Sequence, residues 1–140
     1  MKKAVIFYQS MTGTTKNYAQ EIGAYLHTKQ INATYVPVGE YHDKLLRDTD
    51  YILMGCWTKG LMVFLQKPDE IWCDFAQKII IPEHTNVAFF ATFKIRTGSI
   101  FKNMTRYFSN NSNLSFPNLK SRNGKLSEKD RIILDNFIKN

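Results

Sequence analysis

The stretch Ala4-Val5-Ile6-Phe7-Tyr8-Gln9-Ser10-Met11-Thr12-Gly13-Thr14-Thr15 joins an apolar run directly to a short polar segment. The apolar part, Ala4 to Tyr8, has the β-branched and aromatic content of a strand that is buried on both faces. A helical pattern begins near Lys16, so residues 10–15 lie where a strand turns into a helix. Backbone N–H groups and the positive end of the helix dipole converge at such a junction. Residues 10–15 are therefore predicted to bind an anion.

Two familiar phosphate-binding patterns are absent from residues 10–15. The Walker pattern needs a second Gly followed by Lys, and the dinucleotide pattern needs three spaced glycines. The residues present resemble the FMN-phosphate loop of flavodoxins, with matches at Ser10, Thr12, Gly13 and Thr15. Short hydroxyls and N–H donors can surround the oxygens of a phosphomonoester without a bulky cation. The alternative interpretation is a polar turn with an ordinary Ser or Thr helix cap.

Four more apolar runs alternate with helical patterns in the rest of the chain. The expected strands are residues 2–8, 33–38, 51–54, 86–93 and 114–119, with the third ending at Gly55. Helices are expected at residues 14–29 and 68–79, with a short helix or turn at 41–47. A further helix is expected to end near residue 108, and a last helix is expected to begin with a cap formed by Ser127 and Asp130. In the second helix Pro68 suits the first position, Ile71, Phe75 and Ile79 mark the buried stripe, and Trp72 belongs to the core.

Strands that alternate with helices predict an α/β fold, a doubly wound parallel sheet with helices on both faces. The flavodoxin-like order 2-1-3-4-5 puts the fifth strand at an edge, where Pro117 is tolerated. The ligand site is then expected at the carboxyl ends of the first, third and fourth strands. We expect one domain over residues 1–140.

The resemblance is closest to short-chain flavodoxins and implies a flavin site built from three loops. In that family an aromatic residue of the second loop stacks on the isoalloxazine ring, and Trp57 stands at that place here. A glycine of the same loop often lets its peptide turn toward the flavin, and Gly60 is the candidate for this glycine. The third loop departs from the family, which commonly has Tyr amid acidic residues, because it contains Phe93, Lys94 and Arg96. Backbone N–H groups of residues 94–98 are expected to bond the pyrimidine edge. The predicted cofactor-binding residues are Ser10, Met11, Thr12, Gly13, Thr14, Thr15, Cys56, Trp57, Thr58, Lys59, Gly60, Thr92, Phe93, Lys94, Arg96 and Gly98.

Some of these residues have other interpretations. Trp57 and Phe93 could belong to the core, and Gly60 could be an ordinary turn glycine. Cys56 is interpreted as a small packing residue rather than a nucleophile.

The net charge of +7 is concentrated near the end of the chain. Residues 1–93 hold nine Lys and Arg against nine Asp and Glu, whereas residues 94–140 hold ten against three. Such a region could attract an acidic partner or a nucleic acid, or form an ordinary solvated surface. Near a flavin, Lys94 and Arg96 would stabilise its fully reduced anion, so we expect a less negative potential than in acidic flavodoxins.

Several classes of protein do not fit the sequence. Apolar stretches fall far short of about 18 residues, and the run after Met1-Lys2-Lys3 is too short for a secretory signal, so we expect a cytoplasmic protein without membrane attachment. Two cysteines and three dispersed histidines suggest neither a disulfide framework nor a metal centre. A phosphoreceiver domain would need acidic residues where Gln9-Ser10 and Gly55-Cys56-Trp57 stand, and a low-molecular-weight tyrosine phosphatase would need Cys in the first loop.

Three functions remain from the sequence. The first is an FMN-binding carrier, expected to be a monomer, that moves one or two electrons between a reductase and an acceptor with an acidic surface. The second is a flavin-dependent reductase or oxidase of an anionic small molecule, such as a tetrapyrrole or quinone. The third is an FMN-free interaction module that uses its basic region. No recognised nucleic-acid motif is present, so nucleic acid is not the expected ligand.

Overall fold

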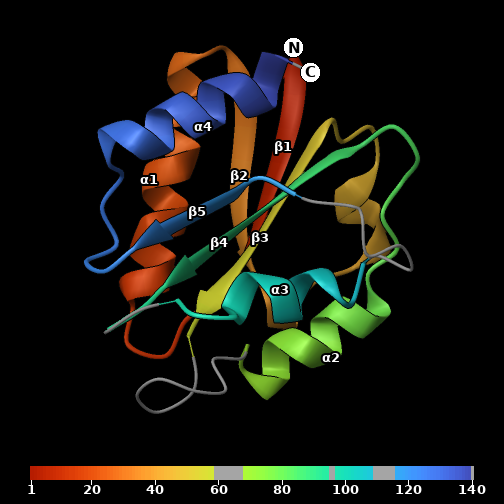
Figure 1. Ribbon diagram of the computed structural model, residues 1–140. Coiled ribbons are helices and arrows are strands. Elements are labelled where there is room, and N and C mark those ends of the chain that lie inside the picture. The colour runs from red at the N-terminus through yellow and green to blue at the C-terminus, as the bar shows by residue number, and fades with distance from the viewer. Residues whose placement is uncertain (59–67, 95–96, 109–115, 140) are drawn as a thin grey trace.

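The computed structural model describes residues 1–58, 68–94, 97–108 and 116–139. Its centre is a five-stranded parallel sheet in the order β2-β1-β3-β4-β5 (Figure 1). The strands are β1 (Lys2–Gln9), β2 (Ile31–Pro37), β3 (Tyr51–Trp57), β4 (Asn86–Thr92) and β5 (Asn118–Ser121). The predicted α/β class and the predicted strand order are therefore confirmed.

Helices cover both faces of this sheet (Figure 1). Helices α1 (Thr14–Thr28) and α4 (Glu128–Lys139) lie on one face, and α2 (Glu70–Lys78) and α3 (Ile100–Thr105) lie on the other. Two short 3₁₀ helices, η1 (Val38–Glu40) and η2 (Asp43–Leu46), connect β2 to β3. Crossover connections of this kind bury a parallel sheet on both sides.

Two apolar cores lie on the opposite faces of the sheet, because successive side chains of a strand point in opposite directions. From β1, Ile6 joins the core beneath α1 and α4, whereas Phe7 joins the core beneath α2 and α3. Trp72 is fully buried in the second core, which confirms its predicted place. The buried stripe predicted for α2 is wrong at Ile71, which is 53% exposed.

Strand β3 is longer than predicted. It continues past Gly55 to Trp57, because Cys56 pairs with Ala91 and Trp57 pairs with Thr92 on β4. Gly55 does not interrupt the strand: the ring of Phe90 packs so closely over it that an added Cβ would lie 2.2 Å from a ring carbon. The glycine therefore marks a close approach within the sheet rather than the strand end.

Two element boundaries differ from the prediction at prolines. Pro68 lies before α2 rather than at its first position, since Asp69 is the N-cap and its carboxylate accepts a hydrogen bond from Ile71 N–H at 2.7 Å. Pro117 lies just outside β5, which begins at Asn118, although its carbonyl accepts from Phe89 N–H at 2.9 Å. The strand predicted at 114–119 was thus placed too early, and residues 114 and 115 lie outside the described residues.

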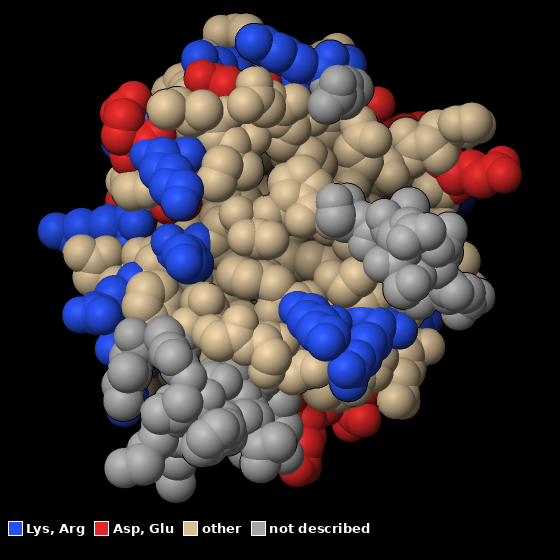
Figure 2. All heavy atoms as spheres, viewed as in Figure 1, with Lys and Arg blue, Asp and Glu red and all other residues tan. Residues whose placement is uncertain are grey.

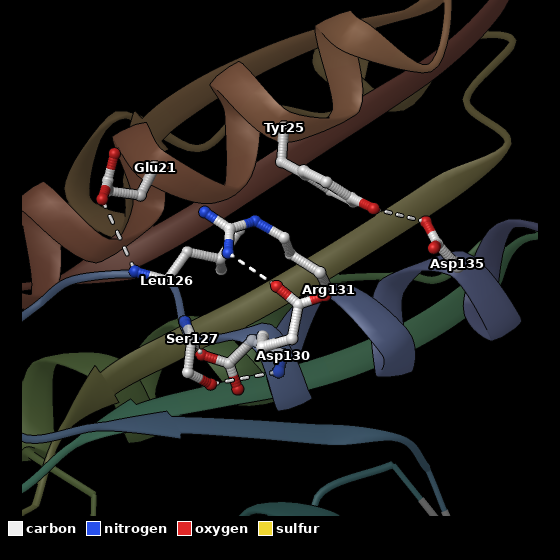
Figure 3. Close-up of polar contacts among 8 residues, drawn as sticks. Glu21, Tyr25, Leu126, Ser127, Asp130, Arg131 and Asp135 are labelled. Atoms are coloured by element: carbon white, nitrogen blue, oxygen red, sulfur yellow. Dashed lines mark hydrogen bonds and ion pairs between the residues drawn. The ribbon is translucent and has the colours of Figure 1, made fainter.

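Helix α4 begins with the predicted cap and is fixed to α1 by polar contacts (Figure 3). Ser127 Oγ accepts from Asp130 N–H at 3.1 Å, and Asp130 Oδ2 accepts from Ser127 N–H at 3.2 Å. The same buried carboxylate oxygen accepts from the Tyr18 hydroxyl of α1 at 2.7 Å. Near the other end of α4, Asp135 accepts from the Tyr25 hydroxyl, and this bond holds the pKa of Asp135 below its usual range.

Candidate functional site

The carboxyl ends of β1, β3 and β4 lie together at one end of the sheet, beside the start of α1 (Figure 1). The register pairs Gln9 with Cys56, and Trp57 with Thr92. The first predicted loop and the described parts of the other two are therefore neighbours in space, at the point where the strand order reverses. Of the predicted residues, Lys59, Gly60 and Arg96 lie outside the described residues.

The first loop leaves the start of α1 open to a ligand. Gly13 is the N-cap with a positive φ of 96°, and no side chain of the described residues caps this end of the helix. Ser10 Oγ instead accepts from Gly13 N–H at 2.9 Å, which closes the turn in front of the helix. The first intrahelical bond reaches the N–H of Asn17, so the N–H groups of residues 14–16 precede it and remain available to an anion. This geometry differs from the ordinary Ser or Thr cap that was the alternative interpretation.

Hydroxyl groups surround the opening of this loop. Thr12 Oγ1 and Thr14 Oγ1 are 3.5 Å apart on its exposed side, and Met11 beside them is 59% exposed. An added Cβ on Gly13 would meet no atom of the described residues within 4 Å, so these residues leave the space next to the glycine open. The loop thus offers hydroxyl and N–H donors around an accessible volume, which is the donor set that a phosphomonoester requires.

Buried threonines connect the first loop to the ends of β3 and β4. Thr15 Oγ1 lies 2.6 Å from Thr92 Oγ1, and both side chains are buried. The Thr92 carbonyl accepts from Thr58 N–H at 2.8 Å. Within the described part of the chain, the buried Thr58 Oγ1 has no hydrogen-bond partner. A buried hydroxyl without a partner is costly, and a polar ligand in this place would satisfy it.

Trp57 is held by its indole nitrogen at the end of β3. Its Nε1–H donates to Asp69 Oδ2 at 3.0 Å, and the side chain is half-buried. The preceding residue, Cys56, is fully buried in the core beneath α2 and α3, and burial raises the pKa of its thiol. Cys56 can therefore face a ligand only through its backbone, and it is a poor nucleophile.

The third loop begins with a partly buried aromatic ring. Phe93 donates its N–H to the Ser121 carbonyl at 3.2 Å, and the Arg122 guanidinium carbon lies 5.5 Å from the ring centroid. Lys94 is exposed, and Gly98 has a positive φ of 52°. One face of Phe93 is thus covered by a cation from the segment that follows β5, a contact the sequence did not suggest.

The turn after β5 supports the first loop, and sequence reasoning missed it. Gly124 has a positive φ of 79°, and its carbonyl accepts from Asn17 Nδ2 at 2.9 Å. An added Cβ on Gly124 would lie 2.6 Å from the Thr14 carbonyl oxygen. The pair Asn123-Gly124 is a common turn signal and was the only sequence feature that marked this place.

Two features are absent from the described residues. No group of three or more His, Cys, Asp or Glu side chains among them is placed to hold a metal ion. None of the helices they form has the length and apolar content needed to cross a bilayer.

The chain belongs to the flavodoxin family, because the flavodoxin family model matches residues 6–111. Among solved structures it is similar to oxidised flavodoxin 2 from Bacillus cereus, with 23% identity, a TM-score of 0.64 and coverage of 96% of this chain and 94% of that one. A short-chain flavodoxin associated with a bacterial microcompartment has 16% identity and a TM-score of 0.68, with coverage of 99% and 95%.

A larger protein shares the fold as well. Rubredoxin oxygen:oxidoreductase from Desulfovibrio gigas has 16% identity and a TM-score of 0.71. The match covers 99% of this chain but only 35% of the oxidoreductase chain. No curated protein matches. At these identities the structural comparisons establish the fold.

Proposed function

We propose that this protein is a single-domain, FMN-binding electron carrier. The observation that carries the proposal is the uncapped start of α1, framed by Ser10, Thr12 and Gly13, at the junction of three strand ends. Members of the flavodoxin family bind FMN. The flavin supplies the redox chemistry when it is bound, and the protein supplies orientation and electrostatics.

The described residues fit the two ends of FMN. In the proposal, Ser10, Thr12 and the N–H groups of residues 14–16 hold the phosphate, where the helix dipole favours negative charge. The Thr58 hydroxyl has no hydrogen-bond partner among the described residues and is available to the same ligand. In the proposal, the Trp57 indole stacks on the ring with an offset, and Phe93 is a second candidate for stacking. Backbone groups of residues 94–98 bond the pyrimidine edge, and of these, residues 95 and 96 lie outside the described residues.

The electron-transfer partners follow from the charge distribution. Lys and Arg side chains form several groups on the face viewed in Figure 2, and residues 94–140 carry the whole excess of positive charge. We therefore propose that the protein delivers electrons to an acceptor with an acidic surface. We also propose that it is a monomer in the cytoplasm and receives its electrons from a reductase.

Lys94→Gln tests the electrostatic part of this proposal. If the Lys94 charge acts over about 8 Å, its removal is expected to make full reduction of the flavin harder by roughly 20 to 90 mV. The lower value corresponds to the dielectric constant of water and the upper one to an effective dielectric constant near 20. Spectroscopic redox titration of the FMN-loaded protein measures this shift. Lys44→Gln is the matched control, since η2 precedes β3 and lies at the opposite end of the sheet. An unchanged or less negative potential in Lys94→Gln would contradict the proposal.

Oxidation of the reduced protein separates the carrier from the alternatives. A carrier is expected to pass electrons to an acidic redox protein at a rate that falls as salt is added. Rapid oxidation by an anionic tetrapyrrole or quinone, without a protein acceptor, would support the reductase or oxidase instead. A protein that binds no FMN but binds DNA or RNA in a salt-sensitive way would support the interaction module.

A further inference from the structure

Asp69 joins three structural elements at the edge of the proposed flavin site. Its Oδ1 accepts from Ile71 N–H at 2.7 Å and caps α2. Its Oδ2 accepts from Trp57 Nε1–H at 3.0 Å and from Gln9 Nε2–H at 3.5 Å. The carboxylate therefore connects the last residues of β1 and β3 to the first turn of α2.

The two carboxylate oxygens have different hydrogen-bond partners. Oδ1 serves the backbone of α2, as an N-cap residue does in most helices. Oδ2 accepts from side chains, and one of its partners is the indole N–H, the only hydrogen-bond donor of the Trp side chain. A half-buried aromatic side chain at a strand end could adopt more than one rotamer, and a hydrogen bond to its single donor favours one ring orientation. The positive end of the α2 dipole also stabilises a carboxylate in this position.

We propose that Asp69 is a positioning residue for Trp57: it fixes the indole orientation before the flavin binds, so that less conformational freedom is lost on stacking. This inference rests on the proposed function, because it assigns Trp57 to the flavin ring. The capping role alone would give Asp69 no influence on the indole. The two roles can be separated because they use different oxygens.

Two substitutions keep the cap and remove the contact with Trp57. Asp69→Asn retains one oxygen for Ile71 N–H but places an NH₂ group against the indole N–H, so two donors face each other. In Asp69→Ser the serine hydroxyl can still cap α2, but the side chain is too short to reach both Ile71 N–H and the Trp57 indole N–H. Because Asn and Ser rank with Asp at the N-cap, the thermal midpoint should change little in either variant.

The first readout uses the flavin-free protein. The indole N–H signal of Trp57 in a ¹H–¹⁵N spectrum should move and exchange faster with solvent in both variants, because the hydrogen bond is lost. The Trp72 indole is the internal control, since it is fully buried and its nitrogen has no hydrogen-bond partner among the described residues. An unchanged Trp57 signal in both variants would overturn the proposal.

The second readout is FMN affinity in a double-mutant cycle. We expect Asp69→Asn to weaken FMN binding about tenfold and to alter the visible circular dichroism of the bound flavin. In a Trp57→Phe background, which has no indole N–H, the same change should have little effect. An equal loss in both backgrounds, or no loss in either, would overturn the role of Asp69 while leaving FMN binding intact. Failure of the unsubstituted protein to bind FMN would overturn both proposals.

Discussion

Asp130→Ala is expected to lower the free energy of unfolding by about 2 to 4 kcal/mol. Asp130 is only 3% exposed, and its carboxylate accepts from the Tyr18 hydroxyl and from Ser127 N–H. Burial raises the pKa of Tyr18, so its hydroxyl keeps its proton and needs an acceptor. The substitution leaves the buried Tyr18 hydroxyl without an acceptor and breaks the cap of α4. The protein no longer has to bury the Asp130 carboxylate, and the removal of this cost offsets part of the lost stability. Urea unfolding measures the difference.

Two comparisons identify the cause of this destabilisation. Asp135→Ala removes the same kind of side chain from the same helix, and Asp135 also accepts from a tyrosine hydroxyl, but it is 39% exposed, so its loss should matter much less. In a Tyr18→Phe background, Asp130→Ala should cost less than in the unsubstituted protein, because no hydroxyl is left without a partner. Equal costs in both backgrounds would show that the Tyr18 contact is not responsible.

Thr12→Ala is expected to weaken FMN binding about 10- to 100-fold, since a hydrogen bond to a charged group contributes roughly 1.5 to 3 kcal/mol. Thr12 is exposed, and its hydroxyl lies 3.5 Å from that of Thr14 at the open start of α1. Its removal should therefore leave the stability of the flavin-free protein nearly unchanged. Quenching of flavin fluorescence during titration gives the dissociation constant.

The matched control for this substitution is Thr28→Ala at the other end of α1. Thr28 is also an exposed threonine, and its hydroxyl donates to the Tyr25 carbonyl. FMN affinity should be unchanged in this variant. Affinity for riboflavin, which lacks the phosphate, should be the same in Thr12→Ala as in the unsubstituted protein. If Thr12→Ala lowered the affinity for FMN and for riboflavin by a similar factor, Thr12 would not act through the phosphate.

The centre of the sheet could be predicted from sequence because β1, β3 and β4 are buried on both faces. Such strands give continuous apolar runs, as in Ala4 to Tyr8, and the first loop contains a specific pattern of hydroxyl residues and glycine. The edge strand was placed less well, because β5 has four residues and only Leu119 and Ser121 are buried. A short pattern of this kind, next to Pro117, gives little information about where a strand begins.

The contacts that arrange the site could not be predicted, because they depend on how elements pack together. The bond from Trp57 to Asp69 requires a particular placement of α2 against β3, and periodicity does not specify that placement. In the sequence Asp69 follows Pro68 at the start of a helix, where an acidic residue favours the helix dipole, and this pattern gives no indication of a contact with Trp57. The support of Thr14 by Gly124 likewise joins residues that are far apart in the chain, and a turn signal does not reveal what the turn contacts.

The assignment of this chain as an FMN carrier is tested by titrating the purified, flavin-free protein with FMN and recording the visible spectrum. The assignment predicts stoichiometric binding, with one FMN per chain, a changed flavin absorption band, and weaker binding of riboflavin. Absence of binding to either oxidised or reduced FMN would contradict it and would leave the basic surface as the place to search for a ligand.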